Sequence, residues 1–348
     1  MKSEIDLPFV SIVIINYNGM RFLKDCLESV LKTDYPAEKI EVMIVDNGST
    51  DGSLEYIQEN FQKVRLIKLS KNVGFAAAAN IGASKSRGEL VVFLNVDTLV
   101  EKNWLIELVR QIVSGPKIAV AGSSVLPMTF KQSHRYVTTV PYLTVLGSVI
   151  EIPTKKRKER IFCGSVHGAA FAVRKSIFKR IGGFDSTYFM YSDEVDLCHR
   201  AWLYGYEVVI CPRSIVYHYG GGIAGGGKES ILYSRVSSAL RAYFGNRNSL
   251  VNIVKNFETK MLIQGLLLSI LFTLLLIISP IRKREKALLV RSWCSFLGNL
   301  KHYLSERKAI ELKRLRSDKW LIKNGLVLDS KKLLKLAFSL MLVNRDNI

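Results

Sequence analysis

The first third of the chain alternates short apolar runs with segments whose apolar residues recur at helical spacing. Runs rich in valine, isoleucine and leucine predict buried strands at residues 9–16, 40–46, 64–69, 90–95 and 118–121. Helical periodicity predicts helices at residues 19–31, 75–86 and 104–113. This strand–helix alternation with short connections predicts an α/β fold built on a doubly wound, mostly parallel sheet.

The pattern weakens between residues 126 and 163, where the basic run 155–160 has the composition of a solvated loop. Regular periodicity then predicts strands at 168–173, 208–211 and 216–218, and helices that end at Ile181 and that cover 194–204. The glycine-rich residues 220–227 favour a hinge or lid over regular structure.

The composition changes beyond Lys228. The pattern of residues 230–257 predicts a long helix. Residues 261–281 are apolar and contain no charged residue, and a segment of this length and composition is a candidate to cross a membrane. Basic residues follow directly, and the rest of the chain alternates basic and apolar positions, as in helices that lie on anionic membranes. We therefore expect one unit at residues 1–227 and a helical, membrane-associated region at 228–348. The alternative is a buried helix inside a soluble helical annex.

The topology of the apolar segment 261–281 stays open. A single span would place the basic tail opposite the first unit, against the tendency of positive charge to stay on the cytoplasmic side. A re-entrant helix, an in-plane helix or a hairpin with residues 287–300 avoids this conflict.

The overall charge indicates anionic partners. The 348 residues carry a net charge of +20 with a pI near 9.7, and 48% are apolar. Because the basic residues cluster near the apolar C-terminal segments, membrane phospholipid is a simpler partner than nucleic acid, and we expect no nucleic acid.

The five cysteines form no C-x-x-C pair, which favours reduced, buried thiols. Residues 1–8 are polar, unlike a signal peptide, so we expect the first unit in the cytoplasm.

Polar side chains follow several of the apolar strands. They lie at the carboxyl ends of these strands, and proteins with parallel sheets bind their ligands at that edge. Asp46 ends the second strand, and its carboxylate can accept hydrogen bonds from a nucleobase; the alternative is a turn residue that caps the next helix. The small residues 72–80 open a helix, which permits close approach of a diphosphate or simply tight packing.

Asn95 and Asp97 end the fourth strand with their side chains on the same side of the chain. Oxygen ligands of this kind suit Mg²⁺ or Mn²⁺ held together with substrate phosphates, whereas the alternative is an aspartate that caps a helix. His218 follows a late strand beside the same predicted crevice, and is either a metal ligand or a structural histidine.

Three acids crowd into four positions at Asp193, Glu194 and Asp196. Such crowding is unfavourable unless the acids bind a cation or share a proton, and one of them can serve as a general base. The alternative is an acidic first helical turn that complements the helix dipole. The motif at 222–228 resembles a phosphate-binding loop, but Glu229 replaces the Ser/Thr that would hold Mg²⁺, so Lys228 belongs to the lid at most.

Taken in order, these segments resemble the family-two glycosyltransferases of the GT-A fold, especially their rhamnosyltransferase-like branch, over roughly residues 9–250. The resemblance rests on residues 11–19, 45–51, 72–80, 93–97, 182–185, 188–201 and His218. Each piece is a modest signal, and the ordered set is specific.

The resemblance implies roles for these positions. Asp46 would bind the base of a nucleotide diphosphate sugar, Asp97 and His218 would bind a divalent metal (Mg²⁺ or Mn²⁺), and the acidic cluster would supply the base of an inverting displacement. Further contacts to the nucleotide sugar are expected from Asn16, Asn18, Asn47, Asn72, Gly74, Asn80 and Asn95. Two positions depart from the pattern: Asn95 replaces an aspartate of the metal motif, and the usual Glu-Asp is Asp193-Glu194. The base therefore falls on Glu194, with Asp193 as the open alternative.

The implied function is transfer of a sugar from a nucleotide diphosphate sugar to a hydroxyl of a glycan or lipid-linked acceptor. It would serve cell-surface polysaccharide or glycolipid synthesis at the cytoplasmic face of the membrane. A non-catalytic nucleotide-sugar-binding or membrane-surface protein on the same fold is the rival interpretation. A dinucleotide oxidoreductase is excluded because Asn16–Gly19 stands where G-x-G-x-x-G would be required. The sugar, the base (thymine or uracil by resemblance) and the acceptor stay open.

Overall fold

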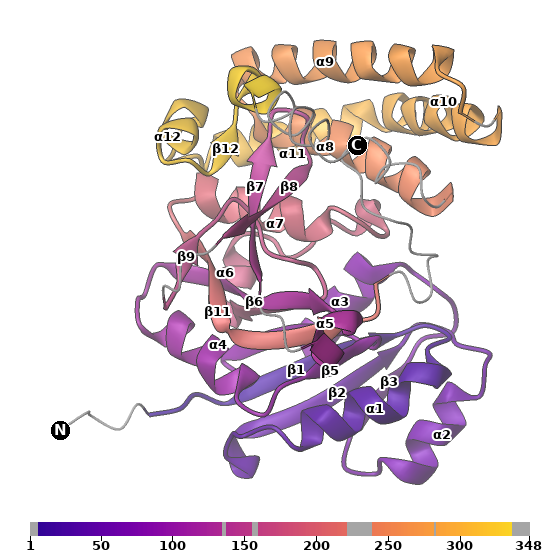
Figure 1. Ribbon diagram of the computed structural model, residues 1–348, viewed down its shortest axis with the longest axis vertical. Helices are drawn as coiled ribbons and strands as arrows, with labels where there is room; N and C mark the ends of the chain where they lie inside the picture. The colour runs from indigo at the N-terminus through magenta and orange to yellow at the C-terminus, as the bar shows by residue number, and fades with distance from the viewer. Residues whose placement is uncertain (1–5, 134–136, 155–158, 221–238, 282, 336–348) are drawn as a thin grey trace.

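A computed structural model describes residues 6–133, 137–154, 159–220, 239–281 and 283–335. Figure 1 shows a sheet-based part at the N-terminal side and a layer of helices formed by the C-terminal residues. The expected boundary between residues 227 and 228, the glycine-rich stretch 221–227 and Lys228 lie outside the described residues.

The main sheet is mixed but rich in parallel pairs, in the order β3-β2-β1-β4-β10-β6-β11-β5, with β9 paired to β11. Its first four strands in space run parallel, β10 is antiparallel to both neighbours, and β6 and β11 are again parallel. The strands are β1 (Val10–Asn16), β2 (Ile40–Asp46), β3 (Arg65–Lys68), β4 (Leu90–Asn95), β5 (Thr98–Val100), β6 (Ile118–Pro127), β9 (Ile161–Phe162), β10 (Ala170–Arg174) and β11 (Glu207–His218). The predicted α/β class and its strands are confirmed, and the two strands expected at 208–218 form one strand with a bulge between Cys211 and Ile215.

Both faces of this sheet are covered, which explains its nearly continuous apolar strands. Along β1, Val10, Ile12 and Ile14 point into one core, which also contains residues of α1 (Met20–Leu31), α2 (Ser53–Asn60) and α4 (Trp104–Val113). Val13 and Ile15 point into a second core with α3 (Phe75–Lys85), α6 (Lys175–Arg180) and α7 (Asp193–Leu203). Successive side chains of a strand alternate between faces, so the two cores share one strand.

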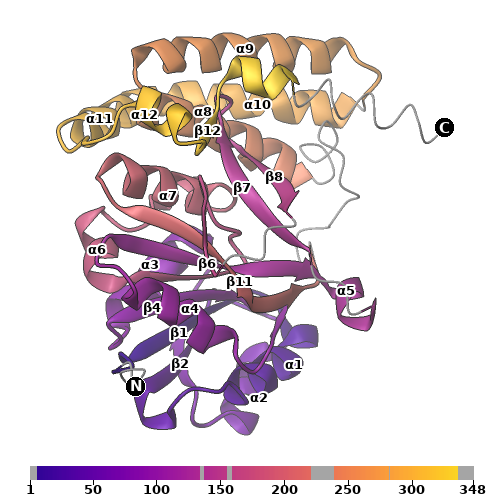
Figure 2. The same ribbon diagram turned by 60° about the vertical axis from the view of Figure 1, so that its left-hand side comes forward.

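A three-stranded sheet, unpredicted by the weak pattern of residues 126–163, joins the first part to the C-terminal helices. Strands β7 (Thr138–Thr144) and β8 (Val149–Thr154) form a hairpin, and β12 (Val327–Leu328) pairs with β7. Pro141 and Pro153 lie within the two strands of the hairpin, and proline lowers the strand signal of a sequence. Figure 2 shows this hairpin rising from the main sheet to the helical layer.

The C-terminal helices form a second body against α7 and the hairpin. They are α8 (Asn246–Asn256), which follows a π-helix at Arg241–Gly245, α9 (Thr259–Ile278), α10 (Lys283–Gly298), α11 (Leu300–Glu311) and α12 (Asp318–Lys323). All eleven residues of α8 are buried, so this helix is the centre of the region rather than a surface annex. Of the long helix expected at 230–257, the structure describes residues 239 onward.

Helix α9 lies in the outermost layer beside α10 (Figures 1 and 2). Among the described residues it is the one helix with the length and hydropathy of a membrane span, with a mean hydropathy of 2.6, a test that core helices also pass. One side of α9 is packed against the protein through Met261, Gly265, Ser269, Thr273 and Leu276. Its other side exposes Ile263, Leu267, Ile270, Leu271, Leu274, Leu275 and Ile278.

Candidate active site

The ends of β1 and β2 are joined by buried polar side chains around Asp46. Asn16, which is fully buried, donates from Nδ2 to Asp46 Oδ1 at 2.8 Å and also contacts Ser49 and Ser53. The backbone N–H of Ser49 donates to Asp46 Oδ2 at 3.1 Å. A carboxylate has about four acceptor sites, and among the described residues two hydrogen bonds to Asp46 occupy two of them. Asp46 itself is only 2% exposed.

The neighbouring loops are tied together by three asparagines that the sequence analysis placed in the nucleotide-sugar site. Asn18 accepts from Thr50 N at 2.8 Å. Asn47 donates to Asn72 Oδ1 at 3.0 Å, and Asn72 in turn accepts from Gly74 N at 2.9 Å. These contacts fix the loops after β1, β2 and β3 relative to one another.

Gly74 and Asn80 connect α3 to the segment that precedes the acidic cluster. Gly74 has a φ of +86°, and a Cβ there would lie 2.5 Å from the carbonyl oxygen of Phe189, so only glycine fits. Asn80 exchanges two hydrogen bonds with the backbone of Phe184, at 2.8 and 3.0 Å. Both residues therefore stabilise the structure. Their role in nucleotide-sugar binding stays a prediction.

Asp97 and His218 meet although 121 positions separate them. Asp97 Oδ1 and His218 Nε2 are 3.1 Å apart, and the two side chains are only 10% and 16% exposed. The antiparallel pairing of β5 with β11 sets Thr98 opposite His218, which brings the neighbouring Asp97 to the histidine. A carboxylate and an imidazole side by side fit a divalent cation whose other ligands come from a substrate.

The turn at residues 167–169 links this pair to the acidic cluster. His167 packs edge-on against His218 with ring centroids 5.6 Å apart, and its Nδ1 accepts from Ala169 N. Ala169 O accepts from Asn95 N at 2.9 Å. A Cβ on Gly168 would lie 3.2 Å from Cδ of Glu194, so the glutamate lies directly against this turn. Asn95, Asp97, His218 and Glu194 thus surround one short segment.

Glu194 and Asp193 are held partly as neutral acids. Burial, with the neighbouring carboxylate of Asp193, raises the pKa of Glu194 to about 8. Burial and the charge of Asp196 raise the pKa of Asp193 to about 7. Asp193 is 4% exposed, and its Oδ2 has no hydrogen-bond partner among the described residues, whereas Glu194 retains partial exposure. Of these two acids, Glu194 is the more accessible to a ligand.

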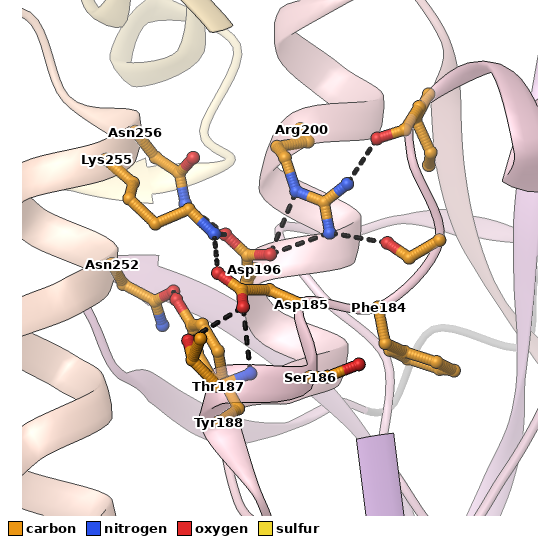
Figure 3. A network of polar contacts seen from close by, with 12 residues as sticks. Phe184, Asp185, Ser186, Thr187, Tyr188, Asp196, Arg200, Asn252, Lys255 and Asn256 are labelled. Atoms are coloured by element: carbon orange, nitrogen blue, oxygen red, sulfur yellow. Dashed lines mark hydrogen bonds and ion pairs between the residues drawn. The ribbon is translucent and has the colours of Figure 1, made fainter. Parts of the chain in front are cut away.

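Asp196 turns away into a buried ionic network that Figure 3 shows. Arg200 donates to its Oδ2 from Nε at 2.9 Å and from Nη2 at 2.6 Å, and Asn256 donates to its Oδ1 at 3.0 Å. Lys255 Nζ lies 3.3 Å from Asp196 and 2.5 Å from Asp185. Burial alone would raise the pKa of Asp196, but Arg200 and Lys255 outweigh it and hold that pKa well below its usual range. Asp196 is therefore a permanent anion with its acceptors occupied, which argues against it as the base.

Sequence reasoning missed three residues of this region: His167, Arg247 and Asn248. His167 precedes strand β10 as the only titratable residue of its turn, which is the kind of signal that marks a strand-end site. Arg247 and Asn248 belong to a polar face of α8 that continues with Asn252, Lys255 and Asn256 at helical spacing. Polar residues repeated at i, i+4 in a helix without solvent exposure indicate contact with buried polar groups.

Comparisons with known proteins identify the family that this chain resembles. Residues 11–182 match the family described as "Glycosyl transferase family 2". Glycosyltransferase AglE of Haloferax volcanii is 34% identical over 122 residues, which are 34% of this chain and 40% of the relative. Poly-beta-1,6-N-acetyl-D-glucosamine synthase of Staphylococcus epidermidis is 26% identical over 216 residues, 60% of this chain and 49% of the relative. The chain thus spans less than half the length of these two relatives.

Solved structures with the GT-A fold superpose on most of the chain. Mannosyltransferase PcManGT from Pyrobaculum calidifontis, in complex with GDP-Man and Mn²⁺, has a TM-score of 0.54 at 15% identity and covers 89% of this chain and 86% of its own. S. aureus TarS 1-349 in complex with UDP-GlcNAc has a TM-score of 0.53 at 17% identity and covers 87% and 90%. At these identities the likeness establishes the fold.

The ionic network yields a test of stability. We expect Lys255→Met to lower the free energy of unfolding by about 3 kcal/mol, because Asp185 loses its cation and the two buried acids repel each other. Denaturant unfolding of the full chain measures this loss. Lys260→Met, which removes an exposed lysine near the start of α9, should change stability by roughly 0.5 kcal/mol or less. Equal effects of the two changes would contradict the importance given to the network.

Proposed function

We propose, on the premise that the chain is a family 2 glycosyltransferase, that it transfers a sugar with inversion from a nucleotide diphosphate sugar to an acceptor hydroxyl. The observation that carries the proposal is the meeting of Asp97 with His218, 3.1 Å apart, beside the turn that also contacts Glu194. A carboxylate–imidazole pair next to a partly exposed acid supports the proposal, because the transfer requires a metal ligand set and a base.

The donor that we propose is a uridine diphosphate sugar. Support comes from structural relatives solved with UDP or UDP-GlcNAc, and from Asp46, whose free acceptor sites suit the imide N–H of uracil. The relative bound to GDP-Man makes guanine the competing base. The transferred sugar in this proposal is a hexosyl or rhamnosyl group, which rests on the resemblance to the rhamnosyltransferase-like branch alone.

Asp97 and His218 would hold the divalent ion, in keeping with two relatives solved with Mn²⁺. When bound, Mg²⁺ or Mn²⁺ supplies positive charge that stabilises the departing diphosphate. Within the protein, the burial of both side chains strengthens this electrostatic interaction, because it excludes water from around the charges.

Glu194 is the proposed general base. In its deprotonated form it accepts the proton of the acceptor hydroxyl while that oxygen attacks the anomeric carbon from the side opposite the diphosphate. Three observations favour Glu194 over its neighbours: its partial exposure, its position against Gly168, and the burial of Asp193 and Asp196. The raised pKa makes deprotonated Glu194 a stronger base than an ordinary carboxylate, and its deprotonated fraction grows as the pH rises through about 8.

The acceptor that we propose is a glycan or a lipid-linked sugar at the cytoplasmic face of a membrane. The exposed side of α9 is a continuous apolar stripe, with Leu267 62% and Ile278 77% exposed, and the exposed Lys283 and Arg284 follow at the start of α10. Because the opposite side of α9 is packed on the protein, with Gly265 close to the backbone of Val145, we propose that α9 lies in the membrane plane rather than spanning it.

Glu194→Gln tests the base. We expect this change to lower kcat for sugar transfer by roughly 10²–10⁴-fold, because the amide cannot accept the proton, while the Kd for UDP stays unchanged. Transfer is measured by release of the nucleoside diphosphate with a panel of donor sugars, and UDP binding by calorimetry.

Asp193→Asn is the matched comparison for Glu194→Gln, since it neutralises the adjacent acid, and it should retain most of the activity. In the wild type, kcat/KM should rise as the pH is raised through about 8, the raised pKa of Glu194, since the base acts when deprotonated. Full turnover by Glu194→Gln, or loss in Asp193→Asn alone, would move the base to Asp193.

His218→Ala tests the metal site. We expect the affinity for Mn²⁺ to fall by at least about tenfold and the Mn²⁺ concentration for half-maximal activity to rise accordingly, because one of two protein ligands is lost. Titration of Mn²⁺ followed by electron paramagnetic resonance, in the presence of UDP, measures binding without relying on turnover. His302→Ala, at an exposed position of α11, is the control; an unchanged Mn²⁺ affinity in His218→Ala would remove the histidine from the site.

The pair of changes Leu267→Glu and Leu271→Glu tests the membrane contact. We expect roughly 100-fold weaker binding to vesicles that contain anionic phospholipid, since each leucine would otherwise bury apolar surface in the lipid. Co-sedimentation with vesicles measures the binding. Phe162→Glu, at a half-exposed aromatic residue of β9, serves as the control, and equal binding by the α9 variant and this control would exclude α9 as the contact.

A further inference from the structure

The segment that leads into Glu194 has an unusual backbone. Phe189, Tyr191 and Ser192 have φ values of 62°, 66° and 60°, in the left-handed region that side chains other than glycine rarely adopt. Each such residue strains the backbone, so the surrounding structure must hold the segment in place. Ser192 is the N-cap of α7, two residues before Glu194. The conformation of residues 187–192, the lead-in loop, therefore decides where the first turn of α7 points.

Helix α8 holds the lead-in loop through its backbone carbonyls. Asn248 Nδ2 donates to the carbonyl oxygens of Tyr188, Met190 and Tyr191, at 3.1, 2.9 and 2.7 Å. The amide of Asn248 is itself oriented, because its Oδ1 accepts from Arg247 Nε at 2.9 Å, which turns the Nδ2 group towards the loop.

Arg247 adds two further contacts of the same kind. Its Nη2 donates to the carbonyl oxygens of Thr187 at 2.6 Å and Tyr188 at 2.9 Å. Asn248 is fully buried and Arg247 is 8% exposed. Two side chains of α8 thus donate to four of the six backbone carbonyls of the lead-in loop. Most of this loop has no regular secondary structure.

The lead-in loop is also held by α3 and by an aromatic stack with the π-helix that precedes α8. Phe75 N donates to Phe189 O at 2.6 Å, and the ring of Phe189 stacks on Phe244 at 5.2 Å. The loop is therefore held between the helix that follows the predicted nucleotide loops and the helix that begins the C-terminal body.

We propose that Arg247 and Asn248 are positioning residues for Glu194: they hold the lead-in loop in its left-handed conformation and so aim the glutamate at the turn beside Asp97 and His218. The inference rests on the proposed role of Glu194 and extends it to a helix outside the sheet. Without the two donors, the carbonyls of a buried loop lose their partners, and the left-handed residues relax towards ordinary φ values. A displacement of about 1 Å of a reacting group costs roughly 10²-fold in rate.

The experiment compares two buried asparagines of α8 in the full chain. Asn248→Ala removes the contacts to the lead-in loop, and the matched control Asn246→Ala removes a hydrogen bond of 2.6 Å to Ser292 of α10. We expect both variants to lose stability, but only Asn248→Ala to lose roughly 10² in kcat, with the KM for the donor and the Kd for UDP within about threefold of wild type. Similar kcat values in the two variants would overturn the proposal.

A double-mutant cycle separates positioning from general weakening. If Asn248 acts through Glu194, Asn248→Ala should have no further effect on kcat in a Glu194→Gln background, whereas an independent effect would multiply. Arg247→Lys, which keeps the charge but loses the two-pronged geometry, provides the same comparison should Asn248→Ala fail to fold; it should lower kcat in the wild type and not in Glu194→Gln. Full losses in the double variants would overturn the proposal. Full activity of Glu194→Gln alone would instead overturn the assignment of the base.

Discussion

Four charges buried between α7 and α8 are the interaction on which the rest of the site depends. Asp185 and Asp196 belong to the sheet-based part, as does Arg200, while Lys255 comes from α8. Two acids and two bases balance, and each acid has hydrogen-bond donors besides its ion pairs (Figure 3). Burying charge is costly unless it is paired, and Asp185 of the sheet-based part has its ion pair with Lys255 of α8. The C-terminal helices are therefore part of the folded site.

Helix α8 links the loop that precedes Glu194 to the outer helix α9. The same α8 that carries Lys255 also donates to the lead-in loop, and α9, with its apolar outer side, packs directly behind it. Helix α9, with its exposed apolar side, and the loop that precedes Glu194 thus pack against one buried helix, α8. All eleven residues of this asparagine-rich helix are buried, and its amide groups have buried partners. Those of Asn248, Asn252 and Asn256 donate to groups outside the C-terminal helices, and that of Asn246 donates to Ser292 of α10.

The sequence predicted the sheet and the strand-end residues because both depend on local order. Apolar runs located β1, β2 and β4, and the polar residue at the end of each run identified Asp46 and Asn95–Asp97. Only the family resemblance joined His218 to Asp97, because the pairing of β5 with β11 is a contact over more than a hundred residues that local sequence does not reveal. The β7–β8 hairpin was missed because its prolines weaken the strand pattern. The role of α8 was missed because its partners are backbone carbonyls, which carry no signature in side-chain identity.

Glu194 and Asp196 show how far environment can separate two acids of one helical turn. Both are withdrawn from water, which raises the pKa of any carboxyl group. Asp196 faces Arg200 and Lys255, which reverse that shift and keep it ionised, whereas Glu194 faces Asp193, which adds to it. A residue fixed as an anion is suited to hold structure, and a residue whose pKa lies near 8 is suited to exchange a proton. The neighbours of the two carboxylates therefore give them opposite properties. Of the two cations that keep Asp196 ionised, Arg200 belongs to α7 and Lys255 to α8. The same α8 donates through Asn248 to the loop that precedes Glu194.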